Sequence, residues 1–230
     1  MKSICLLSGG LDSLVSLAAA KKETDVILAL TFDYGQRSFR DENESASKIS
    51  AYYKVPHKTI KLDWLKEITH TALVDKSKTV PVYTEKDLEA NPDILQGNAR
   101  LVWVPNRNAV FVNIAASYAE ALGAELIVSG FNSEEAATFS DNSLQFTSCA
   151  NALLRVSTLS RPRLVSYVQS FNKSGIVNTG VKLNVPFKLF YSCYHVSKNG
   201  IMCGECESCA RIKRAFRDAG KFAIVEKMFV

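Results

Sequence analysis

Short apolar segments alternate with segments of helical spacing along the first quarter of the chain. Residues 2–7 predict a buried strand, and residues 25–32 form a continuous apolar run that is typical of a central parallel strand. Residues 57–62 alternate and predict a third strand. Between these strands, residues 12–22 and 40–53 have the composition and spacing of helices. The order strand, helix, strand, helix, strand predicts an α/β fold with a doubly wound, mostly parallel sheet.

The same alternation resumes after a long irregular stretch. Residues 63–105 contain three prolines, and a connection this long usually covers a functional site or carries short helices. Residues 107–122 are apolar on almost every side and predict a buried helix that ends at Gly123. The remaining expected elements are a strand over 125–129, a helix over 143–157, a strand over 163–168 and a helix over 172–182.

Composition and charge narrow the class of protein. Of the 230 residues, 47% are hydrophobic and 22% are charged, so disorder and coiled coil are excluded as descriptions of the whole chain. The length predicts a single domain over residues 1–230. The net charge of +5 suits an anionic small ligand and is weak support for nucleic acid, which we do not expect as a partner.

The apolar start of the chain does not indicate a membrane protein. No apolar run is long enough to span a bilayer. The first apolar segment meets Ser8-Gly9-Gly10 at once, so it reads as a strand and not as a signal peptide. We therefore expect a cytoplasmic location, where thiols stay reduced, and no membrane partner.

A glycine-rich turn joins the first predicted strand to the first predicted helix. It reads Ser8-Gly9-Gly10-Leu11-Asp12-Ser13, and its free backbone N–H groups and helix N-terminus favour an anion. Ser8 and Ser13 add hydroxyl donors, and Asp12 could hold Mg²⁺. The alternative is an ordinary strand–helix turn with a capping residue. No G-x-x-x-x-G-K-[ST] run occurs, so this is not a Walker-type loop.

The pattern S-G-G-x-D-S resembles the phosphate loop of the PP-loop ATP pyrophosphatases, which implies transfer of AMP from ATP to an oxygen with release of pyrophosphate. The run Thr31-Phe32-Asp33-Tyr34-Gly35-Gln36-Arg37 narrows the resemblance to the QueC family of 7-cyano-7-deazaguanine synthases. Three further segments follow in the order of that family: Val104-Pro105-Asn106-Arg107-Asn108, Gly130-Phe131-Asn132, and the cysteine-rich segment near the C-terminus.

Four cysteines near the C-terminus have the spacing of a metal site. Cys193, Cys203, Cys206 and Cys209 form C-x9-C-x2-C-x2-C, which suits a tetrahedral structural zinc within a small segment at 186–220. An iron–sulfur cluster, a redox C-x-x-C pair and a substitute ligand at His195 are the alternatives. The resemblance favours zinc, because QueC-like proteins are zinc proteins.

The resemblance also implies roles for individual residues, with ATP and Mg²⁺ as cofactors beside Zn²⁺. The expected ATP-binding residues are Leu7, Ser8, Gly9, Gly10, Leu11, Asp12, Ser13, Leu14, Asp33, Tyr34, Gln36 and Arg37. The expected substrate-binding residues are Arg107, Asn108, Gly130, Asn132, Glu134, Glu135 and Asp141. The expected catalytic residues are Asp12, Arg107 and Lys173.

The substrate half departs from the family pattern, which leaves three hypotheses open. Glu135 stands where the family has Asp, Asn142-Ser143 replace Cys-Arg, and Gly175 replaces Glu. The first hypothesis is an ordinary synthase acting on a deazaguanine and ammonia. The second is a paralogue of bacterial antiviral operons that passes the activated deazaguanine to a protein amine. The third is a tRNA-modifying PP-loop enzyme or a non-catalytic binding module. We expect a homodimer in either enzyme case.

Overall fold

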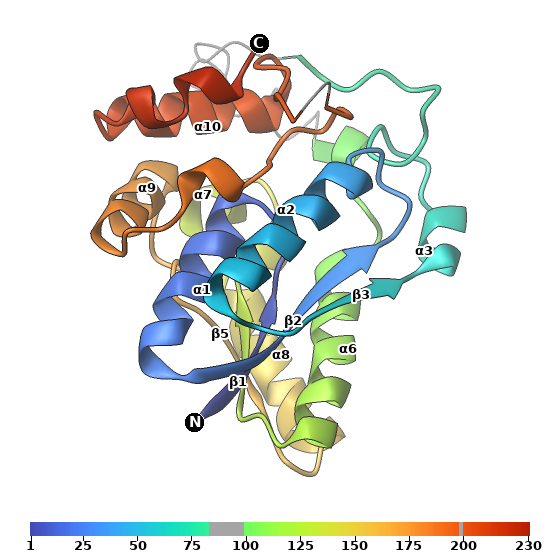
Figure 1. The fold of residues 1–230 in the computed structure, drawn as a ribbon. Coiled ribbons are helices and arrows are strands. Elements are labelled where there is room, and N and C mark those ends of the chain that lie inside the picture. The colour runs from blue at the N-terminus through green and yellow to red at the C-terminus, as the bar shows by residue number, and fades with distance from the viewer. Residues whose placement is uncertain (83–98, 198–199) are drawn as a thin grey trace.

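The computed structural model describes residues 1–82, 99–197 and 200–230. Its centre is a sheet of five parallel strands in the order β3-β2-β1-β4-β5 (Figure 1). The strands are β1 (Lys2–Leu6), β2 (Asp25–Asp33), β3 (His57–Lys61), β4 (Leu126–Ser129) and β5 (Arg163–Ser166). The predicted doubly wound sheet is confirmed, and every predicted strand is present to within two residues at each end.

The long helices cover both faces of this sheet. On one face α1 (Leu11–Glu23) packs against α2 (Phe39–Tyr53) and against α9 (Lys173–Lys182) (Figure 1). On the other face α6 (Arg107–Leu122) packs against α8 (Leu144–Ser157). The strand order reverses beside β1, where the chain leaves for β2 on one side and returns through β4 on the other. In such sheets a ligand site lies at this switch point, beyond the carboxyl ends of the strands.

Helix α6 shows how the sequence determines one boundary. Its C-terminal residue Leu122 is followed by Gly123, which has a φ of +67° and donates its N–H back to the last turn. The left-handed conformation is inexpensive only for a residue without a Cβ atom. The predicted glycine cap is therefore confirmed.

Several short helices lie outside the predicted pattern. They are α3 (Asp63–Glu67), α7 (Ser133–Ala136) and 3-10 turns at Ser140–Asn142, Phe187–Leu189, Phe222–Ile224 and Glu226–Met228. The longest unpredicted element is α10 (Glu207–Asp218), which packs against α9 at the top of Figure 1. Helix α3 agrees with the short helices expected within 63–105, while residues 83–98 of that stretch lie outside the described residues.

Two apolar cores lie on the two faces of the sheet. The core beside α1 and α9 includes Cys193, Cys206 and Cys209, so the cysteine segment packs into the same core as the helix that follows β1. The other core surrounds α6 and includes Phe32. Cys5, in the central strand, is fully buried, and burial raises the pKa of its thiol to about 12. That thiol therefore stays protonated and unreactive at neutral pH.

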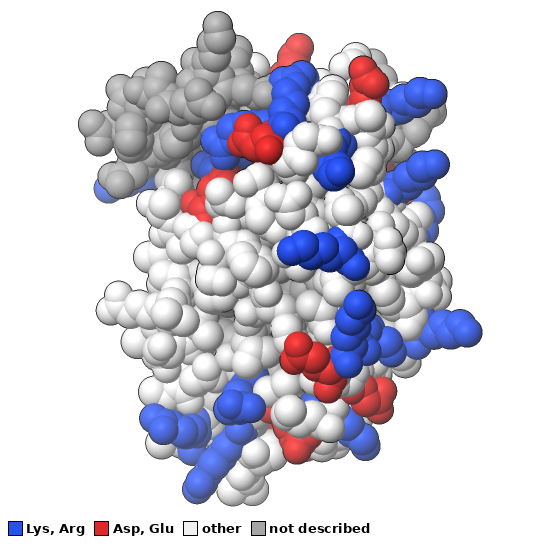
Figure 2. Space-filling model, turned by 90° about the vertical axis from the view of Figure 1, so that its left-hand side faces the viewer, with Lys and Arg blue, Asp and Glu red and all other residues white. Residues whose placement is uncertain are grey.

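The surface view agrees with the modest net charge. On the face shown in Figure 2, lysine and arginine side chains form small separate groups with acidic groups among them, and broad uncharged areas lie between these groups. This face therefore carries no continuous basic stripe of the kind that follows a nucleic-acid backbone. Among the described residues, no helix has both the length and the apolar character needed to cross a membrane.

Candidate active site and metal site

A pocket opens where the central strands end, at the switch point of the sheet. Its cavity volume is about 270 Å³, close to the lower end of the range for small-molecule sites. The floor is formed by the ends of β1 and β2, and the walls come from the N-termini of α1 and α6 and from the segment after β4. Segments that are far apart in the sequence therefore meet around one cavity.

The turn after β1 has the shape of an anion-binding loop. Gly10 precedes the first turn of α1, and the side-chain hydroxyls of Ser8 and Ser13 lie 3.1 Å apart. The loop is held from behind, because the carbonyl oxygen of Gly9 accepts hydrogen bonds from the Ser45 hydroxyl at 2.8 Å and the Tyr191 backbone N–H at 2.9 Å. With its backbone fixed in this way, the N-terminus of a 13-residue helix faces the pocket, and such a helix end favours an anionic group.

Two glycines are required by the close packing around this loop. Gly9 has a φ of +85°, and a Cβ atom built on it would lie 2.4 Å from the carbonyl oxygen of Glu42. At the end of β4, a Cβ atom on Gly130 would lie 2.8 Å from the backbone nitrogen of Ser13. Strand β4 can therefore approach the first turn of α1 only because residue 130 lacks a side chain.

A lysine between two carboxylates forms the charged centre of the pocket. The Nζ atom of Lys173 lies 2.5 Å from Oδ2 of Asp12 and 2.6 Å from Oε1 of Glu135. Burial alone lowers the pKa of Lys173, but the two carboxylates outweigh it and hold that pKa above its ordinary value. The lysine is therefore a fixed positive charge beside the phosphate loop at neutral pH.

Asp12 differs from an ordinary aspartate in two ways. Burial raises the pKa of its carboxyl to about 6, against the opposing charge of Lys173. Its second oxygen, Oδ1, is buried and has no hydrogen-bond partner. A buried carboxylate oxygen without a partner is costly, and a hard cation is the group that such an oxygen suits. The chemistry of this oxygen therefore fits a hard divalent cation such as Mg²⁺, which Asp12 would hold.

An aromatic wall and an arginine also line the pocket. The rings of Phe32 and Phe111 stack with centroids 4.0 Å apart, and Tyr34 packs beside them. Arg107 donates a hydrogen bond from Nη1 to the Tyr34 hydroxyl at 3.1 Å, and its guanidinium lies over the same ring. Asn106, which precedes it, adopts a positive φ of 52° and so turns the chain into α6. A planar base and an anionic group can both be held by this combination.

The predicted site residues divide into two groups. Those that line the pocket are Leu7, Ser8, Gly10, Leu11, Asp12, Ser13, Tyr34, Gln36, Arg107, Asn108, Gly130, Glu135, Asp141 and Lys173. Those that do not line it are Gly9, Leu14, Asp33, Arg37, Asn132 and Glu134. Gly9 and Leu14 are both buried: Gly9 lies within the loop, and Leu14 follows it in α1.

The other four residues outside the lining have visible structural partners. Asp33 accepts a hydrogen bond from the Gly35 N–H at 3.0 Å, within the turn after β2. The guanidinium of Arg37 donates to the carbonyl oxygens of residues 75 and 78. The side chain of Asn132 caps α7, and Glu134 forms ion pairs with α10. Their proposed contacts with ligand remain predictions.

The structure adds lining residues that sequence reasoning missed. They are contributed mainly by the end of β2, by the stretch before α6 and by the C-terminal third, and include Thr31, Glu42, Trp103, Phe139, Tyr191, Ser192, Tyr194, Ser208 and Ile212. Glu42 accepts hydrogen bonds from the Ser38 hydroxyl at 2.6 Å and the Gln36 amide at 3.0 Å. The rings of Trp103 and Phe139 stack at 6.3 Å, with 19° between their planes. Stacked aromatic rings at a pocket wall suit a planar heterocycle.

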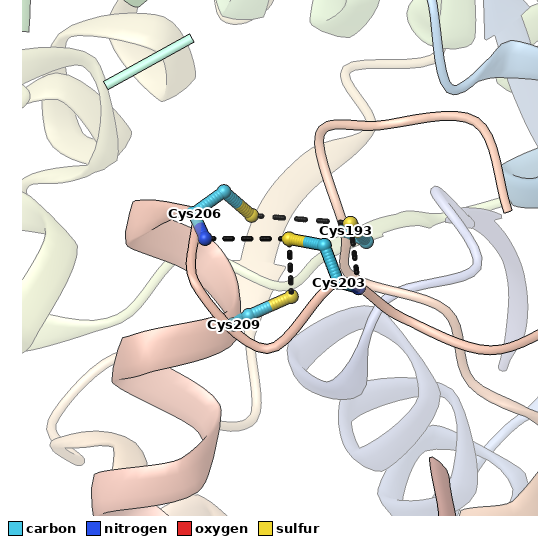
Figure 3. A group of neighbouring side chains, drawn as sticks. All are labelled: Cys193, Cys203, Cys206 and Cys209. Carbon is cyan, nitrogen blue, oxygen red and sulfur yellow. Dashed lines mark hydrogen bonds between the residues drawn. The ribbon is translucent and has the colours of Figure 1, made fainter. Parts of the chain in front are cut away.

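The four predicted cysteines converge on one point (Figure 3). Their sulfur atoms all lie within 4.8 Å of one another, with 3.9 Å between Cys193 and Cys206 and 3.8 Å between Cys203 and Cys209. Four thiolates around one zinc ion with bonds of about 2.3 Å would lie about 3.8 Å apart, so the arrangement fits a tetrahedral ion. These separations are too long for disulfides.

Backbone groups support this metal site. The sulfur of Cys193 accepts from the backbone N–H groups of His195 and Cys203, and the sulfur of Cys203 accepts from those of Glu205 and Cys206. Such bonds orient thiolate ligands and reduce their negative charge. The imidazole of His195 is not part of the group of ligand atoms, and this residue contributes only its backbone N–H, which donates to the sulfur of Cys193 at 3.3 Å.

The comparisons with known proteins agree with one another. A family model described as "Queuosine biosynthesis protein QueC" matches residues 2–220. A 7-cyano-7-deazaguanine synthase of Pelotomaculum thermopropionicum is 50% identical over 220 residues, which are 96% of this chain and 98% of the relative. A second synthase, of Carboxydothermus hydrogenoformans, is 49% identical over 214 residues, 93% of this chain and 97% of the relative.

A solved structure shares the fold at low sequence identity. The NMN synthetase of Francisella tularensis matches with a TM-score of 0.50 and 17% identity, over 96% of this chain and 86% of that one. At this level of identity the match supports the fold alone. It agrees with a parallel sheet that is covered by helices on both faces.

Proposed function

This chain belongs to the QueC family, and from that premise we propose that it converts 7-carboxy-7-deazaguanine into 7-cyano-7-deazaguanine with ATP and ammonia. It is an ATP-utilising enzyme by family, and the proposal adds that the bond formed is between carbon and nitrogen. The observation that carries it is the Lys173 amine between Asp12 and Glu135 at the mouth of a preformed phosphate loop. The high identity over nearly the whole length of synthase relatives supports the same reaction.

The chemistry explains why adenylation is needed. A carboxylate resists attack because its leaving group would be an oxide ion. In the proposed first step a substrate carboxylate oxygen attacks the α-phosphorus of ATP, and pyrophosphate leaves. Ammonia then attacks the acyl carbon, AMP departs and the resulting amide loses a proton. A second ATP adenylates the amide oxygen, and the nitrile forms as AMP and two protons are lost.

The roles of the chain in these steps are binding and charge stabilisation. The hydroxyls of Ser8 and Ser13 and the first turn of α1 would hold the leaving pyrophosphate. Asp12 would hold Mg²⁺, which supplies positive charge to the phosphates when bound. Lys173 and Arg107 both line the pocket, so they can stabilise the negative charge that develops on the transferred phosphoryl group.

The structure accounts for part of the departure from the family pattern in the substrate half. The Ser143 hydroxyl caps α8 by accepting from the Phe146 N–H at 3.0 Å. Gly175 lies in the first turn of α9, where its N–H donates to Asn172. Glu135 and Asn142 line the pocket, and Glu135 is engaged by Lys173. Two of the four changes, Ser143 and Gly175, therefore lie at the starts of helices. Separately, the comparisons give no support to a protein amine as the acceptor.

Product analysis tests the proposed function directly. With 7-carboxy-7-deazaguanine, ammonium, Mg²⁺ and ATP, we expect 7-cyano-7-deazaguanine by mass spectrometry, with two AMP formed per nitrile. The same mixture without ammonium should stop at pyrophosphate exchange. A deazaguanine adduct on an added protein, with little nitrile, would contradict the proposal and support the paralogue. Absence of both exchange and product would favour a binding module.

The pKa of Asp12 predicts how the reaction depends on pH. The carboxyl must be ionised to hold a cation, and its pKa is raised to about 6. We therefore expect kcat/KM for ATP to fall as the pH drops through about 6, because this ratio reports ionisation in the free enzyme. Glu135→Gln removes a negative charge that raises this pKa, so the midpoint should move to lower pH. A profile that stays flat down to pH 5 would contradict this role for Asp12.

A further inference from the structure

A cluster of charged side chains lies behind the active site and outside its lining. Oε1 of Glu134 lies 3.2 Å from Nη1 of Arg211 and also pairs with the guanidinium of Arg214. Nη2 of Arg211 lies 2.8 Å from Oε1 of Glu207, one turn earlier in α10. All four side chains are at least 83% buried by their fractional exposures of 17%, 8%, 17% and 7%. Helix α10 is therefore joined to α7 by the ion pairs of Glu134 with Arg211 and Arg214.

Glu134 also reaches the catalytic lysine through its other carboxylate oxygen. Oε2 of Glu134 accepts a hydrogen bond from the backbone N–H of Lys173 at 2.9 Å. The next residue, Glu135, accepts from the Nζ atom of the same lysine at 2.6 Å. The short helix α7 thus contacts Lys173 at two points, the backbone N–H and the side-chain amine of that lysine.

Helix α7 is held by polar contacts, which also include a hydrogen bond from the Ser133 N–H to the carbonyl oxygen of Phe171 at 3.1 Å. It is four residues long, and none of those residues is fully buried. Apolar packing therefore cannot locate it firmly, and its polar contacts must. The contacts on its outer side come from α10, whose N-terminal region carries Cys206 and Cys209 of the metal site. A chain of contacts then runs from the cysteine cluster through Arg211 and Glu134 to Lys173.

We infer that Glu134 is a positioning residue, which with Arg211 and Arg214 holds Lys173 against Asp12, so that the cysteine-bearing helix sets the geometry of the active-site ion pair. The inference rests on the proposed function, because it assigns a purpose to the Lys173–Asp12 pair. It differs from the role expected from sequence, in which Glu134 would contact the substrate base. A buried ion pair that served stability alone would leave the Lys173–Asp12 contact unaffected by its loss.

The test compares wild type with Glu134→Gln in two measurements. The first is the distance between Nζ of Lys173 and Oδ2 of Asp12 in crystal structures, which is 2.5 Å in the present arrangement. The second is the separate effect on kcat and on KM for ATP in pyrophosphate release. Displacement of a lysine that stabilises developing charge lowers kcat, whereas loss of a purely structural ion pair lowers only the melting temperature.

We expect the contact between Lys173 and Asp12 to open in Glu134→Gln, and kcat to fall by roughly 10-fold to 100-fold with KM for ATP nearly unchanged. Glu134→Asp, which keeps the charge but shortens the reach, should give a smaller fall and serves if the first variant does not fold. Glu207→Gln is the matched control, because it removes another buried partner of Arg211, one that lies on α10 itself. It should lower the melting temperature and leave both the contact and kcat in place.

A closed contact between Lys173 and Asp12, or an unchanged kcat, in folded Glu134→Gln or Glu134→Asp would overturn the inference. So would the same losses in Glu207→Gln, because the effect would then follow from any loss of charge around Arg211. The proposed function fails separately, if wild type gives no pyrophosphate exchange with 7-carboxy-7-deazaguanine. The contact distance is measured without turnover, so the two failures are distinguishable.

Discussion

Asp12→Ala is expected to lower the rate of ATP-dependent adenylation by roughly 1,000-fold, a loss typical of removing a group that stabilises charge in the transition state. The substitution removes the carboxylate of the phosphate loop and leaves Lys173 paired with Glu135 alone. The fold should be preserved, because the raised pKa of about 6 shows that the ionised carboxyl is held at a cost. The melting temperature of the variant should therefore stay close to that of wild type.

The measurement is pyrophosphate release with 7-carboxy-7-deazaguanine present. Asp63→Ala is a suitable control, since Asp63 is also an aspartate in the first turn of a helix but is exposed and outside the pocket. The control should turn over at the wild-type rate. Release by Asp12→Ala at a rate near that of wild type would remove Asp12 from the mechanism, and with it the site proposed for Mg²⁺.

Cys206→Ser is expected to remove the metal and to destabilise the fold by at least about 4 kcal/mol, as losses of structural metal sites do. For a chain of this length that corresponds to a fall of roughly 10 °C in melting temperature. Cys206 is fully buried and directly precedes α10, so the helix loses its anchor at the N-terminus. Activity should fall as well, because Ser192 and Tyr194, on either side of Cys193, line the pocket.

Elemental analysis and thermal melting check this result together. Wild type should contain one zinc per chain, and Cys206→Ser much less. Cys149→Ser is the matched control, because Cys149 is an exposed cysteine on α8 away from the cluster. It should keep both the zinc and the melting temperature. Iron in wild type, with a visible absorption band, would replace the zinc assignment with an iron site.

The sheet and its main helices were predictable because their apolar periodicity is strong. Strand β2 is nearly continuous in apolar residues, and α6 is apolar on most sides. Helix α10 was missed although Cys209, Ile212 and Phe216 are buried at helical spacing. The apolar pattern is interrupted by charged residues, which sequence reasoning places on the surface. Glu207 and Arg211 are instead buried as an ion pair, and the sequence gives no sign of such pairing.

The site was predictable where residues near in sequence also act together. The phosphate loop and the four cysteines have spacings that the chemistry itself requires. The polar residues after β2 were harder to place, because side chains of these types form hydrogen bonds within the protein as well as with ligands. Asp33 accepts from a backbone N–H in its own turn, and Arg37 donates to a backbone carbonyl oxygen. Tyr191 and Ile212 were missed for a different reason: only the folded chain brings residues so far along the sequence to the mouth of β1.

The chain order of the lining has a consequence for synthesis on the ribosome. Strand β1 and the phosphate loop are made first, yet the neighbouring strand β4 begins at Leu126 and the last lining residue is Ile212. At 5–20 residues per second, translation separates the two ends of the pocket by roughly 10 to 40 s. Until β4 has been made, the central strand has β2 as a partner and its other edge is open. The nascent chain therefore presents an unpaired edge of apolar sequence until β4 emerges, and the pocket stays incomplete until Ile212 has emerged as well.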